Sequence, residues 1–160
     1  MTKTDAINKF LTGEEKHNAL DFIEFLTANQ ITTQPNSNNI RDFYYQNKTI
    51  CCVTVKGAEN IANPWMIWLS DAELDAMALN NTADESLKQF AWAHMNTCAH
   101  FSSNGESCGC DKSPGRSATV FGKQFDNICY ATLSFENPGA EDLVYIKQLV
   151  SLLKDWIDKK

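Results

Sequence analysis

The residues best suited to chemistry lie in one short stretch, CAHFSSNGESCGC at 98–110, which contains three cysteines and a histidine. Thiolates and imidazoles are the ligands that zinc prefers in closed, four-coordinate structural sites, and soft sulfur ligands favour zinc over harder cations. A further cysteine lies in a strand predicted downstream. We therefore expect a structural zinc ion with four cysteine ligands: Cys98, Cys108, Cys110 and Cys129.

Two histidines are alternative ligands for the same ion. His100 lies two residues after Cys98, and His94 lies four residues before it. Residues four apart share a face of a helix, so His94 and Cys98 would point towards one ion if the helix predicted there reaches Cys98. The cysteine spacing, Cys-x9-Cys and then Cys-x-Cys, differs from the Cys-x2-Cys pairs of zinc ribbons and fingers. The pattern is thus compatible with zinc without being diagnostic of it.

Two other interpretations of these cysteines stay open. In the first they are free thiols, and Cys98 and Cys129 simply fill space in the core, as buried cysteines often do. In the second, one of them is the reactive thiol of an enzyme or a redox sensor, activated by a nearby cation such as Lys112 or a protonated histidine. The sequence does not decide whether the protein is an enzyme.

The elements around these residues can be predicted from periodicity and capping. Thr82 and Glu85 form a capping box, which predicts the start of a helix. One face of this helix is apolar, and it comprises Leu87, Phe90, Ala91, His94, Met95 and Cys98. Residues 127–135 alternate as a strand, with Cys129, Ala131, Leu133 and Phe135 on the same side. A tight turn at Gly122 joins this strand to a short one at 118–122. The metal ligands would then come from a helix end, a loop and a strand.

The rest of the chain predicts further helices and strands. Asn137 as cap and Pro138 as first residue begin a long amphipathic C-terminal helix. In an extended strand adjacent side chains face opposite sides, so one of Cys51 and Cys52 should be buried and the other half-exposed. The remaining elements are helices at 4–12 and 14–30, a polar loop at 31–39, a hairpin over 41–57 with its turn near Asn47 and Lys48, a strand at 65–70, and a helix at 71–79 begun by a second capping box, Ser70 with Glu73.

This order of elements predicts the fold class. Strands and helices do not alternate regularly, which argues against a parallel, doubly wound sheet. We expect a single α+β domain over 1–160, with an antiparallel sheet of four to five strands, helices packed on it, and a cysteine-rich loop at about 98–116.

The composition of the chain argues against two classes of binding partner, nucleic acids and membranes. The 160 residues are 43% hydrophobic and carry a net charge of −6, which argues against binding a nucleic-acid backbone. No apolar run is long enough to cross a membrane, and no secretory signal is present. We therefore expect a cytoplasmic protein, in which cysteines serve as thiols or metal ligands rather than disulfides.

The second half of the chain resembles a known group of proteins. Its features are a cysteine-rich loop, a PG turn, an FGK-x-F-x-N-x-C stretch and an F-x-NP that opens a final helix, all within residues 87–154. In these features the chain resembles a group of small, uncharacterised bacterial proteins with no assigned activity. The resemblance implies a site at Cys98, Cys108, Cys110 and Cys129 but no reaction.

The expected function follows from the zinc site. The ion would order the loop and present a surface to a partner protein or a small molecule, in a binding or regulatory role. The alternative is a cysteine-dependent enzyme or redox sensor that uses a thiol of residues 98–110.

Overall fold

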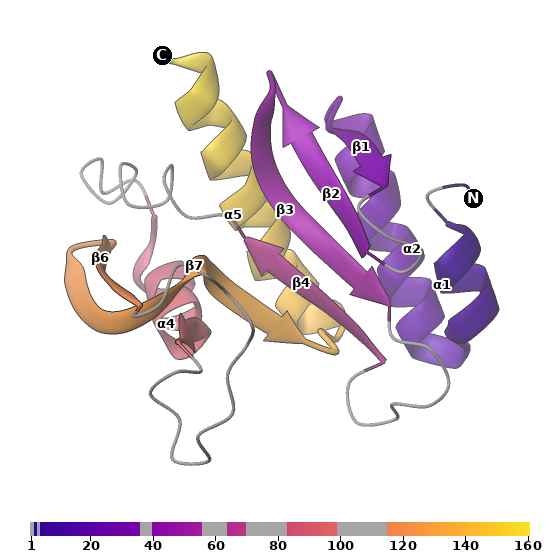
Figure 1. Cartoon of the computed structure of the whole chain (residues 1–160), viewed down its shortest axis with the longest axis horizontal. Helices are drawn as coiled ribbons and strands as arrows, with labels where there is room; N and C mark the ends of the chain where they lie inside the picture. The colour runs from indigo at the N-terminus through magenta and orange to yellow at the C-terminus, as the bar shows by residue number, and fades with distance from the viewer. Residues whose placement is uncertain (1, 3, 36–39, 56–63, 70–82, 99–114) are drawn as a thin grey trace. The chain divides into compact units, whose positions relative to one another are not determined.

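The computed structural model describes all residues except 1, 3, 36–39, 56–63, 70–82 and 99–114. Within that part of the chain it contains four helices and seven strands (Figure 1). The helices are α1 (Asp5–Phe10), α2 (Gly13–Ala28), α4 (Glu85–Ala93) and α5 (Ala140–Asp158). The strands are β1 (Thr32–Pro35), β2 (Ile40–Tyr45), β3 (Lys48–Val55), β4 (Trp65–Leu69), β5 (Met95–Thr97), β6 (Arg116–Val120) and β7 (Lys123–Glu136).

The strands form one antiparallel sheet, which confirms the predicted α+β class. Their order is β1-β2-β3-β4-β7-β5, and β6 also pairs with β7. The number of strands is higher than the four to five predicted. The described chain divides into two compact units, the first comprising Met1–Trp68 with Phe135–Lys160 and the second Leu69–Ser134.

In the first unit, two helices pack on the sheet and a third packs on those two. The helices α1 and α5 contact β3, and α2 contacts both of these helices (Figure 1). The apolar stripe predicted for the C-terminal helix is buried at six of its seven positions, and Trp156 alone is partly exposed. The buried six are Leu143, Ile146, Leu149, Val150, Leu153 and Ile157. Burial of apolar side chains of this size contributes most of the free energy that holds a helix to a sheet.

The segment 31–39, predicted as a polar loop, contains a strand instead. β1 pairs with β2, with Thr32 opposite Tyr44 and Pro35 opposite Arg41. β1 ends the strand order, and an edge strand tolerates proline because one side of its backbone needs no ladder hydrogen bond. Composition indicated a loop here because the segment contributes few apolar side chains of its own.

The β2–β3 hairpin turns at Gln46 and Asn47, one residue earlier than predicted. Both residues have positive φ, 47° and 62°. A two-residue turn with both central residues in this region matches the right-handed twist of the strands it joins. The prediction erred because Gln46 is not a residue type that usually adopts this conformation.

The C-terminal helix begins two residues later than predicted. Gly139 is its N-cap, and its backbone N–H donates to the Asp142 carboxylate at 3.0 Å. Asn137 has a φ of 45°, and its backbone N–H donates to the carbonyl of Trp65 at 2.8 Å. Asn137 therefore forms the turn that leaves β7 and does not cap the helix.

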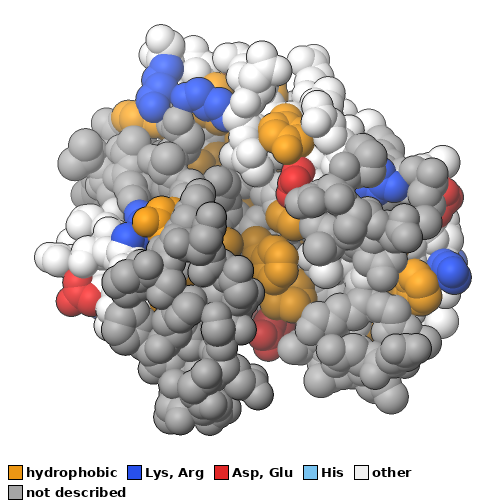
Figure 2. Space-filling view, viewed as in Figure 1, with side chains coloured by type: hydrophobic (Ala, Val, Ile, Leu, Met, Phe, Trp, Pro, Cys, Tyr) orange, Lys and Arg blue, Asp and Glu red, His pale blue; other side chains and the backbone are white. Residues whose placement is uncertain are grey.

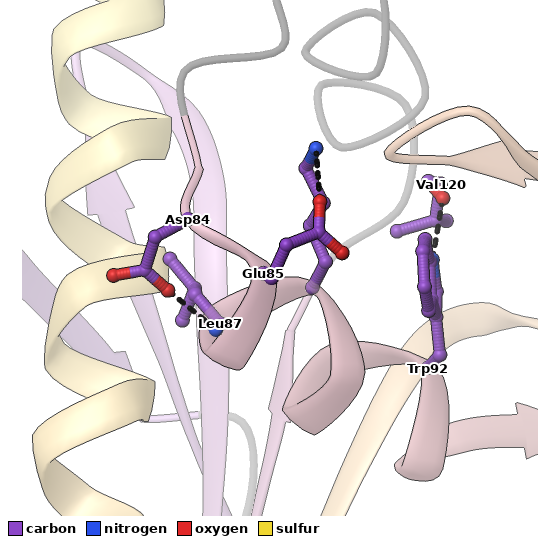
Figure 3. Close-up of polar contacts among 6 residues, drawn as sticks. Asp84, Glu85, Leu87, Trp92 and Val120 are labelled. Carbon is purple, nitrogen blue, oxygen red and sulfur yellow. Dashed lines mark hydrogen bonds and ion pairs between the residues drawn. The ribbon is translucent and has the colours of Figure 1, made fainter.

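In the second unit, α4 also begins at a different residue from the one predicted. The Asp84 side chain accepts a hydrogen bond from the backbone N–H of Leu87 at 2.8 Å, so Asp84 is the N-cap (Figure 3). The predicted box placed Glu85 as the third residue of the helix, but Glu85 is the first and Asp84 caps it, so that assignment is wrong. Thr82 itself lies outside the described residues. The other predicted box, Ser70 with Glu73, and its helix at 71–79 lie outside the described residues.

The β6–β7 hairpin has the tight turn predicted at Gly122. Phe121 and Gly122 have φ of 48° and 81°, and Val120 pairs with Lys123. β7 starts earlier than predicted and runs for 14 residues.

The described residues show neither a patch of one charge on the face drawn in Figure 2 nor a membrane-spanning helix. Figure 2 shows that charged side chains are scattered over this face among neutral and hydrophobic atoms, and the described residues of the face form no patch of one sign. None of the described helices has both the length and the apolar character needed to cross a lipid bilayer.

The N-cap of α4 can be tested by substitution. Asp84→Ala should lower the free energy of unfolding by about 1 kcal/mol, because the Leu87 N–H loses its acceptor. Thr82→Ala, at the cap predicted from sequence, is the matched control and should have a smaller effect. Urea unfolding of both variants measures the difference, and an equal or larger loss for Thr82→Ala would contradict the assignment.

Candidate metal centre

Cys98 follows a strand and does not end a helix, contrary to the prediction. The helix α4 stops at Ala93, and the next residues form β5. Backbone pairing with β7 explains the change: the N–H of Ser134 donates to the His94 carbonyl at 3.1 Å, and the N–H of Cys98 donates to the Asn127 carbonyl at 2.7 Å. The Cys98 side chain is buried, with 7% exposed.

The pairing of β5 with β7 brings Cys129, in β7, near Cys98, which follows β5. Thr97 is opposite Ile128, so Cys98 is opposite Asn127, and Cys129 is two residues further along β7. Diagonal neighbours of this kind have Cα atoms about 7–8 Å apart. Two thiolates on one zinc at about 2.3 Å each have sulfur atoms about 4 Å apart. The register is thus compatible with two ligands for one ion.

Gly115 shows that the chain returns to this point after residues 99–114. A Cβ added at Gly115 would lie 2.7 Å from the Cβ of Cys98 and 3.0 Å from both the carbonyl carbon of Asn127 and the carbonyl oxygen of Ile128. Real Cβ atoms do not approach that closely, so this position requires glycine. Both ends of the cysteine-rich segment therefore lie against the same part of β7.

His94 is not placed beside Cys98. The prediction assumed one helical turn between them, a rise of about 6 Å. The segment between them is extended, and four residues of strand span roughly 13 Å. The His94 ring lies against Phe90, with ring centroids 4.4 Å apart, and its Nδ1 is 2.8 Å from the Phe90 carbonyl oxygen. That carbonyl accepts, so Nδ1 carries the proton in this arrangement.

The remaining predicted ligands, Cys108, Cys110 and His100, lie outside the described residues. Within the described part of the chain, no three or more histidine, cysteine or acidic side chains are grouped so as to hold a metal ion. Cys98 and Cys129 are both free thiols there. Two ligands at most of the predicted set are thus visible, and the site would need the rest from residues 99–114.

The pair Cys51 and Cys52 belongs to the first unit and has a different character. Cys51 is buried and Cys52 is partly exposed, which agrees with the prediction that one of the two would be buried and leaves the choice to the structure. Burial raises the pKa of Cys51 well above its usual value. Burial, together with the Asp42 carboxylate opposite it, raises the pKa of Cys52 to about 12. Both thiols therefore stay protonated at neutral pH and are poor nucleophiles and metal ligands.

Comparison with known proteins does not extend these observations. No family model matches the chain, and no curated protein or solved structure matches it. The resemblance to small bacterial proteins therefore stays a prediction, and function has to be inferred from the residues and their geometry.

The close approach at Gly115 predicts the effect of adding a side chain. Gly115→Ser should lower the free energy of unfolding by about 2 kcal/mol, because overpacking against the Cys98 Cβ and the β7 backbone forces a local shift. Gly139→Ser is the matched control, since a Cβ there meets only Asp142 Oδ2 at 3.9 Å and serine is a favoured N-cap. Thermal or urea unfolding compares them, and equal stability of the two variants would contradict the packing described here.

The raised pKa of Cys52 predicts how stability depends on alkaline pH. The unfolded thiol loses its proton near 9.0, whereas the folded thiol keeps it up to about 12. The unfolded state then binds fewer protons, so the free energy of unfolding falls as pH rises through this window. Cys52→Ser should make that fall shallower, as measured by urea unfolding at several pH values from 8 upwards. Parallel pH profiles for the variant and the parent protein would refute the shift.

Proposed function

We propose that Cys98, Cys108, Cys110 and Cys129 bind one structural zinc ion, and that the region it orders has a binding or regulatory role. The observation that carries the proposal is the contact of Gly115 with Cys98 against β7. The chain leaves this point at Cys98 and returns to it at Gly115, and Cys129 lies two residues from the carbonyl that binds the Cys98 amide.

Chain length supports a shared ion. Cys110 precedes Gly115 by five residues, and five extended residues span at most about 18 Å. The segment 99–114 contains few large apolar side chains, chiefly Phe101, and many Ser, Gly and Asn residues. Such a segment buries too little apolar surface to offset the entropy of ordering it. Zinc bound by thiolates supplies folding free energy of the size needed, as it does in small zinc domains.

The burial of Cys98 favours a structural role over catalysis at that residue. A nucleophilic thiol must reach its substrate and must be a thiolate. Cys98 is 7% exposed, beneath a glycine that admits no side chain, which suits a closed ligand shell. Cys129 is more exposed, so a cysteine-dependent enzyme or redox sensor based on this region remains the competing proposal.

Metal content separates the two proposals. Protein purified without a tag or chelator should contain one zinc per chain by elemental analysis, and native mass spectrometry should show the same adduct. Cys98→Ser and Cys129→Ser should each lower zinc retention during dialysis against a chelator by about tenfold or more. Cys52→Ser is the matched control and should retain zinc, because its thiol stays protonated at neutral pH.

Thiol reactivity provides the contrary outcome. In the zinc-loaded protein, alkylation of the four ligand cysteines should become fast only after chelation. Metal-free protein that takes up no zinc and has one rapidly alkylated thiol at neutral pH would overturn the zinc proposal and favour the enzyme or sensor. Binding of zinc should also weaken as pH falls, since thiolate ligands must be deprotonated.

A further inference from the structure

A lysine on the β6–β7 hairpin lies between two aromatic rings. The Lys123 ammonium is 5.3 Å from the centre of the Trp92 ring and 5.2 Å from the centre of the Phe125 ring. Lys123 is exposed, and the two aromatic side chains are partly exposed. Among the described residues no carboxylate lies within ion-pair distance of Lys123. We call these three residues, Trp92, Lys123 and Phe125, the Lys123 cluster.

The Lys123 cluster is held by the structure beneath it. The Trp92 indole N–H donates to the Val120 carbonyl at 2.7 Å, which fixes the ring against the end of β6 (Figure 3). The turn that follows contains Phe121, a buried aromatic residue with a φ of 48°. A bulky residue is held in this region only when its surroundings determine the backbone. The hydrogen bond from Trp92 in α4 and the backbone of the turn therefore restrict Trp92 and the start of β7, where Lys123 lies.

The restricted position of Lys123 lowers the entropy cost of forming an ion pair with its ammonium group. A surface ion pair usually contributes little, because two long side chains must be immobilised to form it. Here two cation–π contacts already restrict the lysine. A carboxylate arriving at the ammonium thus meets an ordered charge and gains apolar contact with the rings beside it.

From these contacts we infer that the Lys123 cluster binds a peptide segment of a partner protein that carries one carboxylate flanked by apolar side chains. The single lysine matches one negative charge. A polyanion is disfavoured, because the chain as a whole carries −6. Aromatic residues at a partly desolvated position are typical of the residues that dominate binding energy at interfaces. The inference specifies a partner for the binding role proposed above, but it does not depend on the zinc ion.

The test is a titration followed by NMR of the indole N–H groups in the full chain. The probes are acetyl-Leu-Glu-Leu-amide, the same peptide with Gln in place of Glu, and a thymidine hexanucleotide. The Trp92 signal is assigned by its loss in Trp92→Phe. The Glu peptide should shift this signal saturably and bind about fivefold more tightly than the Gln peptide, the effect of one ion pair worth about 1 kcal/mol.

Variants connect the binding to the cluster. Lys123→Gln should abolish the preference for Glu over Gln, and Lys123→Arg should keep it. Lys9→Gln is the matched control, because Lys9 lies over a single ring, Phe10, at 5.0 Å and should not affect binding. Zinc content is measured on the same samples, so a failed zinc proposal and a failed titration are distinguishable.

Three results would overturn the inference: no saturable shift with the Glu peptide, equal affinity for both peptides, or tighter binding of the hexanucleotide. The last result would instead identify a surface that stacks bases on aromatic rings.

Discussion

The second unit depends on the backbone of β7 near Asn127. β7 pairs with β5 and with β6 at the same residue, since Thr97 and Arg116 both lie opposite Ile128. Asn127, directly before it, has a φ of 56°, and the register with β6 shifts by one residue there. A bulge of this kind bends a strand and increases its twist. Its position at the carbonyl that accepts the Cys98 amide brings the two cysteine-bearing segments to one place.

That constraint explains why Gly115 is a glycine and why Cys98 is buried. The chain before β6 passes so close to this place that a Cβ at Gly115 would collide with the Cβ of Cys98 and crowd the backbone of Asn127 and Ile128. The cysteine-rich segment therefore starts and ends at a point fixed by strand pairing, whatever its own preferences. The same hairpin carries Lys123 and Phe125, so one hairpin contributes residues to both the proposed metal site and the proposed peptide site.

Local signals in the sequence predicted the structure correctly where a residue type or period is compatible with only one conformation. Gly122 marks a turn because it adopts a φ of 81°, and the apolar stripe of the final helix is buried as its period indicates. Caps were harder. Asp84 and Gly139 cap their helices, whereas Thr82 and Asn137 matched the pattern equally well. Competing caps two residues apart differ in energy by less than one tertiary contact, such as the hydrogen bond from the Asn137 N–H to the Trp65 carbonyl.

The clearest failure concerns residues 94–98, where an apolar pattern with helical spacing continues past the end of α4. Helix propensity favours continuation by only a few tenths of a kcal/mol per residue. Strand pairing with β7 offers each backbone group a partner and so determines the outcome. The separation of His94 from Cys98 follows from that choice and could not be derived from spacing, because a periodic pattern does not say which partner strand is available.

By itself the sequence determined the α+β class, the opposite facing of Cys51 and Cys52, and the set of thiols from which a metal site could be built. These depend on residue type and on periods of two or 3.6, which are local properties. Only the tertiary structure decided that Cys98 follows a strand, that Cys129 lies two residues from its hydrogen-bond partner, and that Gly115 closes the segment between them. Those facts depend on pairing between residues far apart in the chain, and the energy of such pairing is absent from any short window of sequence.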